Sequence, residues 1–261
     1  MYAFEYHRPG TVAEAASLLG SLEDAKALAG GQTLIATLKL RLAQPSDLID
    51  LGGISELNGI RVEGDNLVIG ALSKHAEVAN SAEVQQHIPA LAALAHSIGD
   101  RQVRAVGTLG GSIANNDPAA DYPAGVLGLG ATVVTSQREL AADDFFTGLY
   151  ETALNPDELI TAVRFPIPQR AAYAKFPNPA SRFALVGVFV AQAADGSVRV
   201  AVTGAGPGVF RVAEMEAALN SHFAPDALYG IRVDADELNS DLHADAAYRA
   251  HLVGVMAKRA V

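Results

Sequence analysis

The stretch AKALAGGQTLIATLKLR, residues 25–41, carries the clearest fold signal in the sequence. Its first part predicts a short buried strand, and its last part, from Thr33 to about Arg41, predicts a helix. Between them lie Gly30 and Gly31, where the absence of a Cβ lets backbone N–H groups come close to a ligand. Strand, glycine loop and helix in this order are typical of a phosphate-binding segment, although a strand-to-helix turn without a ligand has the same pattern.

A second glycine pair lies in GTLGGSIANNDPAADYP, residues 107–123, again beside hydroxyl residues. We expect a loop that starts near Gly99 and ends at a helix beginning about Pro123. The short polar side chains of this segment suit the hydroxyls and phosphates of a dinucleotide, and Asp121 could accept from a sugar or ribityl hydroxyl. Asp117 and Asp121 could also form a catalytic carboxylate pair, but cofactor binding and helix capping explain them better.

A third stretch, GAGPGV at residues 204–209, approaches the G-x-G-x-x-G fingerprint of dinucleotide-binding folds. Val209 stands where the fingerprint has Gly or Ala, and Pro207 removes a backbone donor. We therefore expect a sharp strand-to-helix connection here and not a nucleotide site.

The remaining sequence predicts two units that mix helices and strands. In the first we expect further helices and strands at residues 11–19, 47–51, 59–72 (a hairpin), 75–98 (helical, broken near Pro89), 131–136 and 158–168. Prolines at 166 and 168 cannot continue a central strand, so we place a domain boundary near residues 168–172. The second unit contains a hairpin of residues 182–192 and 197–205 and an amphipathic helix at 210–221.

Charge and residue usage exclude several classes of protein. The net charge of −10 and the lack of any basic run argue against a nucleic-acid surface. The apolar stretches, such as residues 183–194, are shorter than a membrane span, and the first residues do not resemble a signal peptide, so we expect a soluble, cytoplasmic protein. Cysteine is absent and the seven histidines lack ligand spacing, so we expect no metal site, and redox chemistry would need an organic cofactor.

Taken together, AGGQTLIATLKLR, TLGGSIANNDPAADYP and ELITAVRFP resemble the FAD-binding medium subunits of the molybdenum hydroxylases. That group includes the medium subunit of carbon monoxide dehydrogenase and the flavin domain of xanthine dehydrogenase. The resemblance extends over essentially the whole chain. It implies an α+β fold with a two-lobed FAD-binding domain of the vanillyl-alcohol oxidase (PCMH) type at residues 1–168. A small α+β domain of the type found at the C-terminus of carbon monoxide dehydrogenase flavoproteins would follow at residues 169–261.

The resemblance also implies which residues contact the cofactor. The first segment corresponds to one FAD loop and the second to another, while Asn115 and Asp121 correspond to polar contacts and Ile160 to an apolar residue near the flavin ring. The full set is Ala29, Gly30, Gly31, Gln32, Thr33, Leu34, Thr108, Leu109, Gly110, Gly111, Ser112, Asn115, Asp121 and Ile160. Neither loop contains His or Cys, so we expect non-covalent FAD.

In one place the sequence departs from the family. Several relatives have a lysine that reaches the flavin, and Asn178 and Pro179 occupy the corresponding place here, with Lys175 nearby. This difference bears on the potential of the flavin and on its electron acceptor. Arg101 and Arg104, just before the second loop, could meet phosphates or a partner subunit, or could be solvated or locally paired.

The implied function is electron transfer within a complex. In this family the molybdenum cofactor lies in a large subunit, and two [2Fe–2S] clusters in a small subunit pass electrons to FAD. We therefore expect a heterotrimer or a dimer of heterotrimers, in which this chain provides no general acid, base or nucleophile. The alternatives are a self-sufficient flavoprotein oxidoreductase with its own substrate site, and a module that binds nucleotides without redox chemistry.

Overall fold

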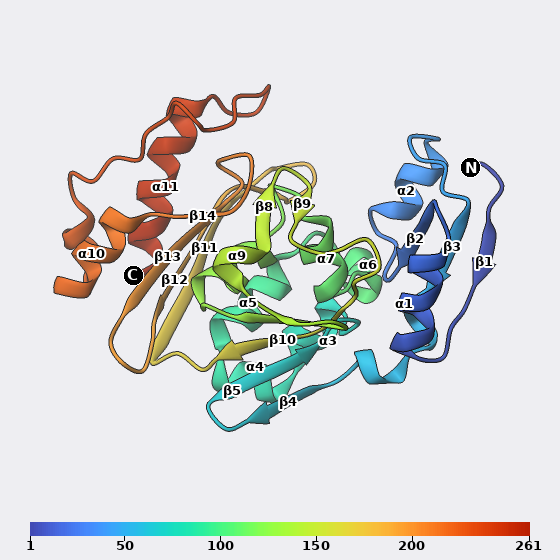
Figure 1. The fold of residues 1–261 in the computed structure, drawn as a ribbon. Coiled ribbons are helices and arrows are strands. Elements are labelled where there is room, and N and C mark those ends of the chain that lie inside the picture. Colours follow the sequence, from blue (N-terminus) through green and yellow to red (C-terminus); the bar gives the residue numbers. More distant parts are fainter.

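This computed structural model describes residues 1–261 as three successive groups of helices and strands, which Figure 1 shows next to one another. The first group is a small parallel sheet in the order β1-β3-β2, with α1 and α2 connecting its strands. Thr11 caps α1 by accepting a hydrogen bond from the Glu14 N–H at 3.2 Å. The bounds are β1 (Glu5–His7), α1 (Val12–Ser21), β2 (Ala25–Leu28), α2 (Leu34–Lys39) and β3 (Asp47–Asp50).

The second group is a five-stranded antiparallel sheet in the order β4-β5-β10-β6-β7. One face, with Leu67, Ile69, Val163 and Phe165, is buried in the largest apolar core, which includes α5, α7 and α8. The strands are β4 (Ile60–Glu63), β5 (Asn66–Gly70), β6 (Thr132–Thr135), β7 (Glu139–Ala141) and β10 (Ile160–Pro166). The helices are α3 (His75–Asn80), α4 (Ala82–His87), α5 (Pro89–Ser97), α6 (Arg101–Val106), α7 (Leu109–Asn115), α8 (Tyr122–Gly128) and α9 (Ala142–Phe145), and a hairpin of β8 (Phe146–Gly148) and β9 (Glu151–Thr152) follows.

The third group is a four-stranded antiparallel sheet, β11-β12-β13-β14, between two layers of helices. Because β12 is buried on both faces, Val186, Val188 and Val190 pack toward α10 and α11, whereas Phe189 and Ala191 join the core of the second group. The third group therefore shares a core with the second group. Its elements are β11 (Arg170–Pro177), β12 (Ala184–Gln192), β13 (Val198–Thr203), β14 (Phe210–Arg211), α10 (Ala213–Ser221) and α11 (Ala246–Ala260).

Most expected elements are confirmed, but the predicted loop at residues 99–123 is wrong, because it contains α6 and α7. Asp100 caps α6 by accepting from the Val103 N–H at 2.8 Å, and Thr108 caps α7 by accepting from the Gly111 N–H at 3.1 Å. The glycines at 110 and 111 lie inside the first turn of α7, where glycine ordinarily weakens a helix. At Gly110, close packing against Ala71, described below, explains the glycine.

Three smaller expectations also need correction. Strand β2 is half-exposed and not buried, because it is an edge strand of its sheet and borders a cavity. The helical region at 75–98 is interrupted at Ser81 as well as before Pro89, so it forms three helices. The connection at residues 204–209 leads first into β14, and only then into α10.

Candidate functional site

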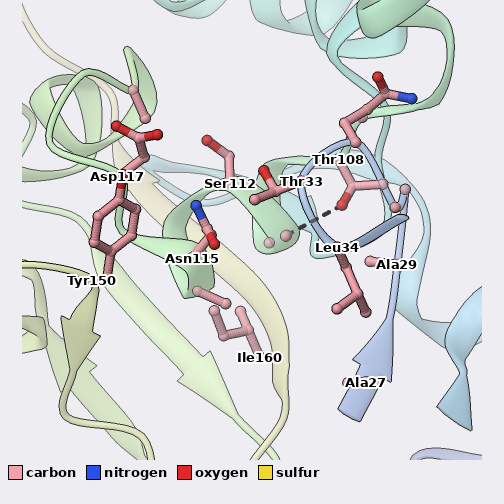
Figure 2. Close-up of a pocket in the computed structure, with 18 of the residues that line it drawn as sticks. Ala27, Ala29, Thr33, Leu34, Thr108, Ser112, Asn115, Asp117, Tyr150 and Ile160 are labelled. Atoms are coloured by element: carbon pink, nitrogen blue, oxygen red, sulfur yellow. Dashed lines mark hydrogen bonds between the residues drawn. The ribbon is translucent and has the colours of Figure 1, made fainter. Parts of the chain in front are cut away.

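A cavity of about 990 Å³ lies where the three groups meet. Figure 2 shows the loop with Ala29, Thr33 and Leu34 on one side of it, and Asp117 and Tyr150 at the other end. Cofactor sites fall in the range of roughly 300–1,000 Å³, so the cavity has room for a large cofactor. Its lining includes all but one of the predicted site residues: Ala29, Gly30, Gly31, Gln32, Thr33, Leu34, Thr108, Gly110, Gly111, Ser112, Asn115, Asp121 and Ile160.

Leu109 is the exception among the predicted residues. Its side chain is fully buried in the main core, because it occupies the first position of α7 and points away from the cavity lining. Leu109 therefore supports the site through packing.

The first glycine segment presents a row of unpaired backbone donors. None of the N–H groups of residues 30–34 makes a hydrogen bond within the chain. Gly31 has a φ of +67°, a conformation that glycine adopts without strain. The side chains of Gln32 and Thr33 are also without partners, and Thr33 does not cap α2 although it precedes it. This loop thus offers N–H groups to an anion such as a diphosphate.

The second glycine segment differs, because the N–H groups of Leu109, Gly110, Gly111 and Ser112 already have partners within the chain. Leu109 N–H donates to Ser73 at 3.0 Å, and Gly110 N–H donates to Ala71 at 2.8 Å. A Cβ at Gly110 would lie 2.6 Å from the Cβ of Ala71, so glycine is needed there for packing. The segment contributes to the cavity through the side chains of Ser112 and Asn115, which make no hydrogen bonds within the chain and lie between Asp117 and the first loop in Figure 2.

The two segments pack against each other. A Cβ at Gly30 would lie 2.3 Å from the carbonyl oxygen of Val106, and a Cβ at Gly111 would lie 3.5 Å from the Cβ of Ala29, an ordinary contact distance. Gly30 therefore lets the loop after β2 approach the end of α6 and the start of α7, about eighty residues later in the sequence, at one wall of the cavity.

The polar run after α7 is fixed by buried hydrogen bonds. Asn116, fully buried with a φ of +43°, donates to the carbonyls of Gly148 at 2.9 Å and Glu151 at 2.7 Å. Thr203 donates its hydroxyl to Ala120 at 2.6 Å, and Gly204 donates its N–H to Pro118 at 2.8 Å. Gly204, the first residue of the glycine stretch at 204–209, thus helps to anchor the loop that carries Asp117 and Asp121. The sequence pattern did not indicate this role.

Asp121 is held by two side chains from β11. The Tyr173 hydroxyl donates to one carboxylate oxygen at 2.6 Å, and Lys175 donates to the other at 2.9 Å and to the Ser97 carbonyl at 3.2 Å. Both members of the ion pair are buried. Burial raises the pKa of Asp121, and the charge of Lys175 and the two hydrogen bonds oppose that rise. Lys175, from the segment where the family lysine is missing, thus fixes a residue of the cavity wall.

His75 and Glu158 are two further titratable side chains of the cavity lining, and the pKa of each is shifted by its surroundings. His75 has an unpartnered Nδ1, and burial, followed by the charge of Arg104, lowers its pKa to about 4, so the ring is neutral. Glu158 is buried, which disfavours its charge, but hydrogen bonds from Arg138, the Asn155 N–H and Thr135 lower its pKa to about 2. Neither group is poised to exchange a proton near neutral pH.

The two arginines before the second segment differ in their surroundings. Arg104 donates to the carbonyls of Ile98 and Gly99 at 2.9 and 3.2 Å, which is local pairing. Arg101 is exposed and makes no ion pair. No group of three or more His, Asp or Glu side chains is arranged to hold a metal ion. None of the helices combines the length and apolar character needed to cross a membrane.

Comparison with known proteins identifies the family to which the chain belongs. Residues 2–168 match the family model described as the FAD binding domain in molybdopterin dehydrogenase. The chain is 38% identical to the carbon monoxide dehydrogenase medium chain of Hydrogenophaga pseudoflava, over 99% of this chain and 96% of that one. It is 37% identical, with the same coverage, to the nicotine 6-hydroxylase medium subunit of Paenarthrobacter nicotinovorans.

Solved structures agree with the sequence relatives. The carbon monoxide dehydrogenase of Hydrogenophaga pseudoflava lacking the Mo-pyranopterin moiety matches with a TM-score of 0.89, covering 99% of this chain and 96% of that one at 38% identity. Quinoline 2-oxidoreductase of Pseudomonas putida 86 matches with a TM-score of 0.86 at 28% identity, covering 99% and 95%. The cavity, its unpaired N–H groups and its paired glycine segments fit FAD, and the chain belongs to the family of FAD-binding domains in molybdopterin dehydrogenases.

Proposed function

We propose that this chain is the FAD-binding electron-transfer subunit of a molybdenum-containing hydroxylase or dehydrogenase. It would receive electrons from [2Fe–2S] clusters of a partner subunit and pass them to an external acceptor. The observation that carries this proposal is that residues of both glycine segments line one cavity, in a chain without cysteine. FAD supplies the redox chemistry when bound, and the protein supplies position and electrostatics.

Within this proposal the residues have distinct tasks. The N–H groups of residues 30–34 bind the diphosphate, and Ser112 and Asn115 accept from or donate to the hydroxyls of the cofactor. Asp121, oriented by Tyr173 and Lys175, and the apolar Ile160 complete the wall. Binding is non-covalent, since no His or Cys lies in either loop.

The partners follow from the relatives. The carbon monoxide dehydrogenase chain is named a medium chain and the nicotine 6-hydroxylase chain a medium subunit, so both belong to larger complexes. By analogy we propose a small [2Fe–2S] subunit and a large molybdenum-cofactor subunit, in a heterotrimer or its dimer. We also propose that residues 1–168 form the FAD domain and 169–261 the C-terminal domain, consistent with the extent of the family match.

The alternative of a self-sufficient oxidoreductase has less support. Three carboxylates of the cavity wall are already engaged: Asp121 by Lys175 and Tyr173, Glu158 by Arg138, and Asp241 by Arg249. The His75 ring is buried, and its pKa of about 4 makes it a weak base, so it is poorly suited to take a proton from a substrate.

The test compares the purified complex with and without FAD. Chaotropic salt removes the flavin, the iron–sulfur clusters are reduced with dithionite, and their reoxidation by an added quinone or dye is followed optically. We expect fast reoxidation only in the FAD-loaded complex. Equal rates in both samples would refute the electron-transfer role, and turnover of a donor by this chain alone would favour the self-sufficient alternative.

A further inference from the structure

We propose that Tyr150 contacts the cofactor, with its ring against the isoalloxazine of bound FAD at the mouth of the cavity. The inference rests on the proposed function and adds a residue to it. Tyr150 lies in the turn between β8 and β9, outside both glycine segments, and no motif in the sequence singles it out.

Tyr150 is both exposed and part of the cavity. Its relative accessibility is 56%, and it lines the cavity together with Leu154 and Ile160. Figure 2 shows its ring beside Asp117, at the end opposite the loop of Ala29 and Leu34. An aromatic side chain in this position can cover a planar ring that enters the cavity.

The backbone of Tyr150 is strained. Its φ is +56°, and the turn position with positive φ is normally taken by Gly or Asn. Asn116 holds the turn by donating to the carbonyls of Gly148 and Glu151, on either side of it. A residue needed only to reverse the chain would be glycine, so the strained tyrosine indicates that its side chain has a use.

The hydroxyl end of the side chain is also positioned. It faces the carboxylate of Asp117, and burial together with that charge raises the pKa of Tyr150. Asp117 is itself fixed, because one of its oxygens accepts from the Ala119 N–H at 2.9 Å. Tyr150 thus lies in a turn that Asn116 fixes, and its hydroxyl faces a carboxylate that is itself fixed.

The exposure of Tyr150 decides between the two ring systems of FAD. An external acceptor must reach the isoalloxazine, so the reactive ring belongs at the open end of the cavity. The unpaired N–H groups that suit the diphosphate lie at the other side, in residues 30–34. We therefore assign the isoalloxazine, and not the adenine, to Tyr150.

The experiment uses three substitutions in the purified complex: Tyr150→Gly, Tyr150→Phe and Tyr150→Trp. The FAD-free complex is titrated with FAD, and affinity and the fluorescence lifetime of the bound flavin are measured. Phenol and indole rings in contact with an isoalloxazine quench its fluorescence, whereas a phenyl ring does not. Arg41→Gly is the matched control, because Arg41 also has a positive φ, +60°, and does not line the cavity.

We expect Tyr150→Gly to bind FAD about tenfold more weakly, with a longer flavin lifetime, while the thermal stability of the FAD-free protein rises. Tyr150→Phe keeps the affinity within about threefold but lengthens the lifetime, and Tyr150→Trp keeps both. Arg41→Gly gains stability and leaves affinity and lifetime unchanged.

Two results overturn the assignment. Unchanged affinity and lifetime in Tyr150→Gly would make Tyr150 a turn residue only. Weaker binding with an unchanged lifetime would place the ring against the adenine. A wild-type complex that binds no FAD would instead refute the proposed function itself, so the two failures are distinguishable.

Discussion

The carbonyl oxygen of Val106 lies against the α-carbon of Gly30, where a Cβ would approach that oxygen to 2.3 Å. This contact joins the loop after β2 to the end of α6, immediately before the second glycine segment. The position of the loop with unpaired N–H groups, residues 30–34, depends on this close contact between Gly30 and Val106.

Gly30→Ala should therefore separate the two segments. Because the neighbour is backbone and cannot rotate away, we expect loss of bound FAD, at least tenfold weaker binding, and a lower melting temperature. Flavin absorbance and thermal unfolding measure these. Gly10→Ala is the control, since nothing lies within 4 Å of a Cβ there. Wild-type flavin content in Gly30→Ala would contradict the described packing.

The two glycines of α7 should respond differently to substitution. In Gly111→Val the new side chain points toward Ala29 and displaces the Thr108 hydroxyl, 2.8 Å from the Cβ position. We expect FAD to be lost, with a modest destabilisation of about 1 kcal/mol from the weakened cap.

Gly110→Ala should instead damage the fold. Its Cβ would lie 2.8 Å from the Ala71 carbonyl oxygen, which accepts the Gly110 N–H. The expected result is a larger fall in the stability of the FAD-free protein than for Gly111→Val. Urea unfolding of both FAD-free variants separates the two effects, and equal destabilisation would mean that Gly111 also serves packing.

His75 should make the stability of the protein depend on pH between about pH 4 and pH 6.5. The folded protein binds its proton only below about pH 4, whereas the unfolded chain binds it below about pH 6.5. The stability from this group is present above pH 6.5 and is lost as pH falls to about 4, in all about 3 kcal/mol. We expect His75→Leu to flatten urea-derived stability across this window. An unchanged pH profile would show that His75 titrates normally.

Glu158 should make the stability of the protein depend on pH in a lower pH range than His75 does. Its folded pKa of about 2 lies below the ordinary value of 4.5, so its stabilisation is present above pH 4.5 and lost as pH falls toward 2. We expect Glu158→Gln to be less stable near pH 7 by about 3 kcal/mol, with the difference from wild type shrinking below pH 4.5. Other carboxylates also titrate there, so the comparison is between the two pH profiles. A constant difference at every pH would contradict the assigned pKa.

Local patterns in the sequence predicted much of the fold. The Thr11 cap, the hairpin at residues 59–72 and the valine-rich strand β12 each carry their signal within a short window. Helices α6 and α7 were missed because glycines 107, 110 and 111 are typical of loops. The caps at Asp100 and Thr108 were the available signal for those helices.

The site was predicted only in part for a related reason. Sequence identified the two glycine segments, and the structure brings them to one cavity. The sequence did not show that Leu109 and Gly110 donate their N–H groups to the carbonyls of Ser73 and Ala71, whereas the N–H groups of residues 30–34 stay unpaired. Nor could it show Tyr173 and Lys175 on Asp121, because that contact joins residues more than fifty positions apart.

The Asp121–Lys175 pair should be the most sensitive point of the cavity wall. Lys175→Met leaves a buried carboxylate with only the Tyr173 hydroxyl, so we expect destabilisation of about 3–5 kcal/mol and a raised pKa of Asp121. Combining it with Asp121→Asn removes the unpaired charge and should restore most of the stability of the FAD-free protein, though not FAD affinity. The double-mutant cycle, measured by urea unfolding, gives the coupling between the two residues. Additive losses would mean that the ion pair does not hold Asp121, and that burial alone fixes it against the cavity.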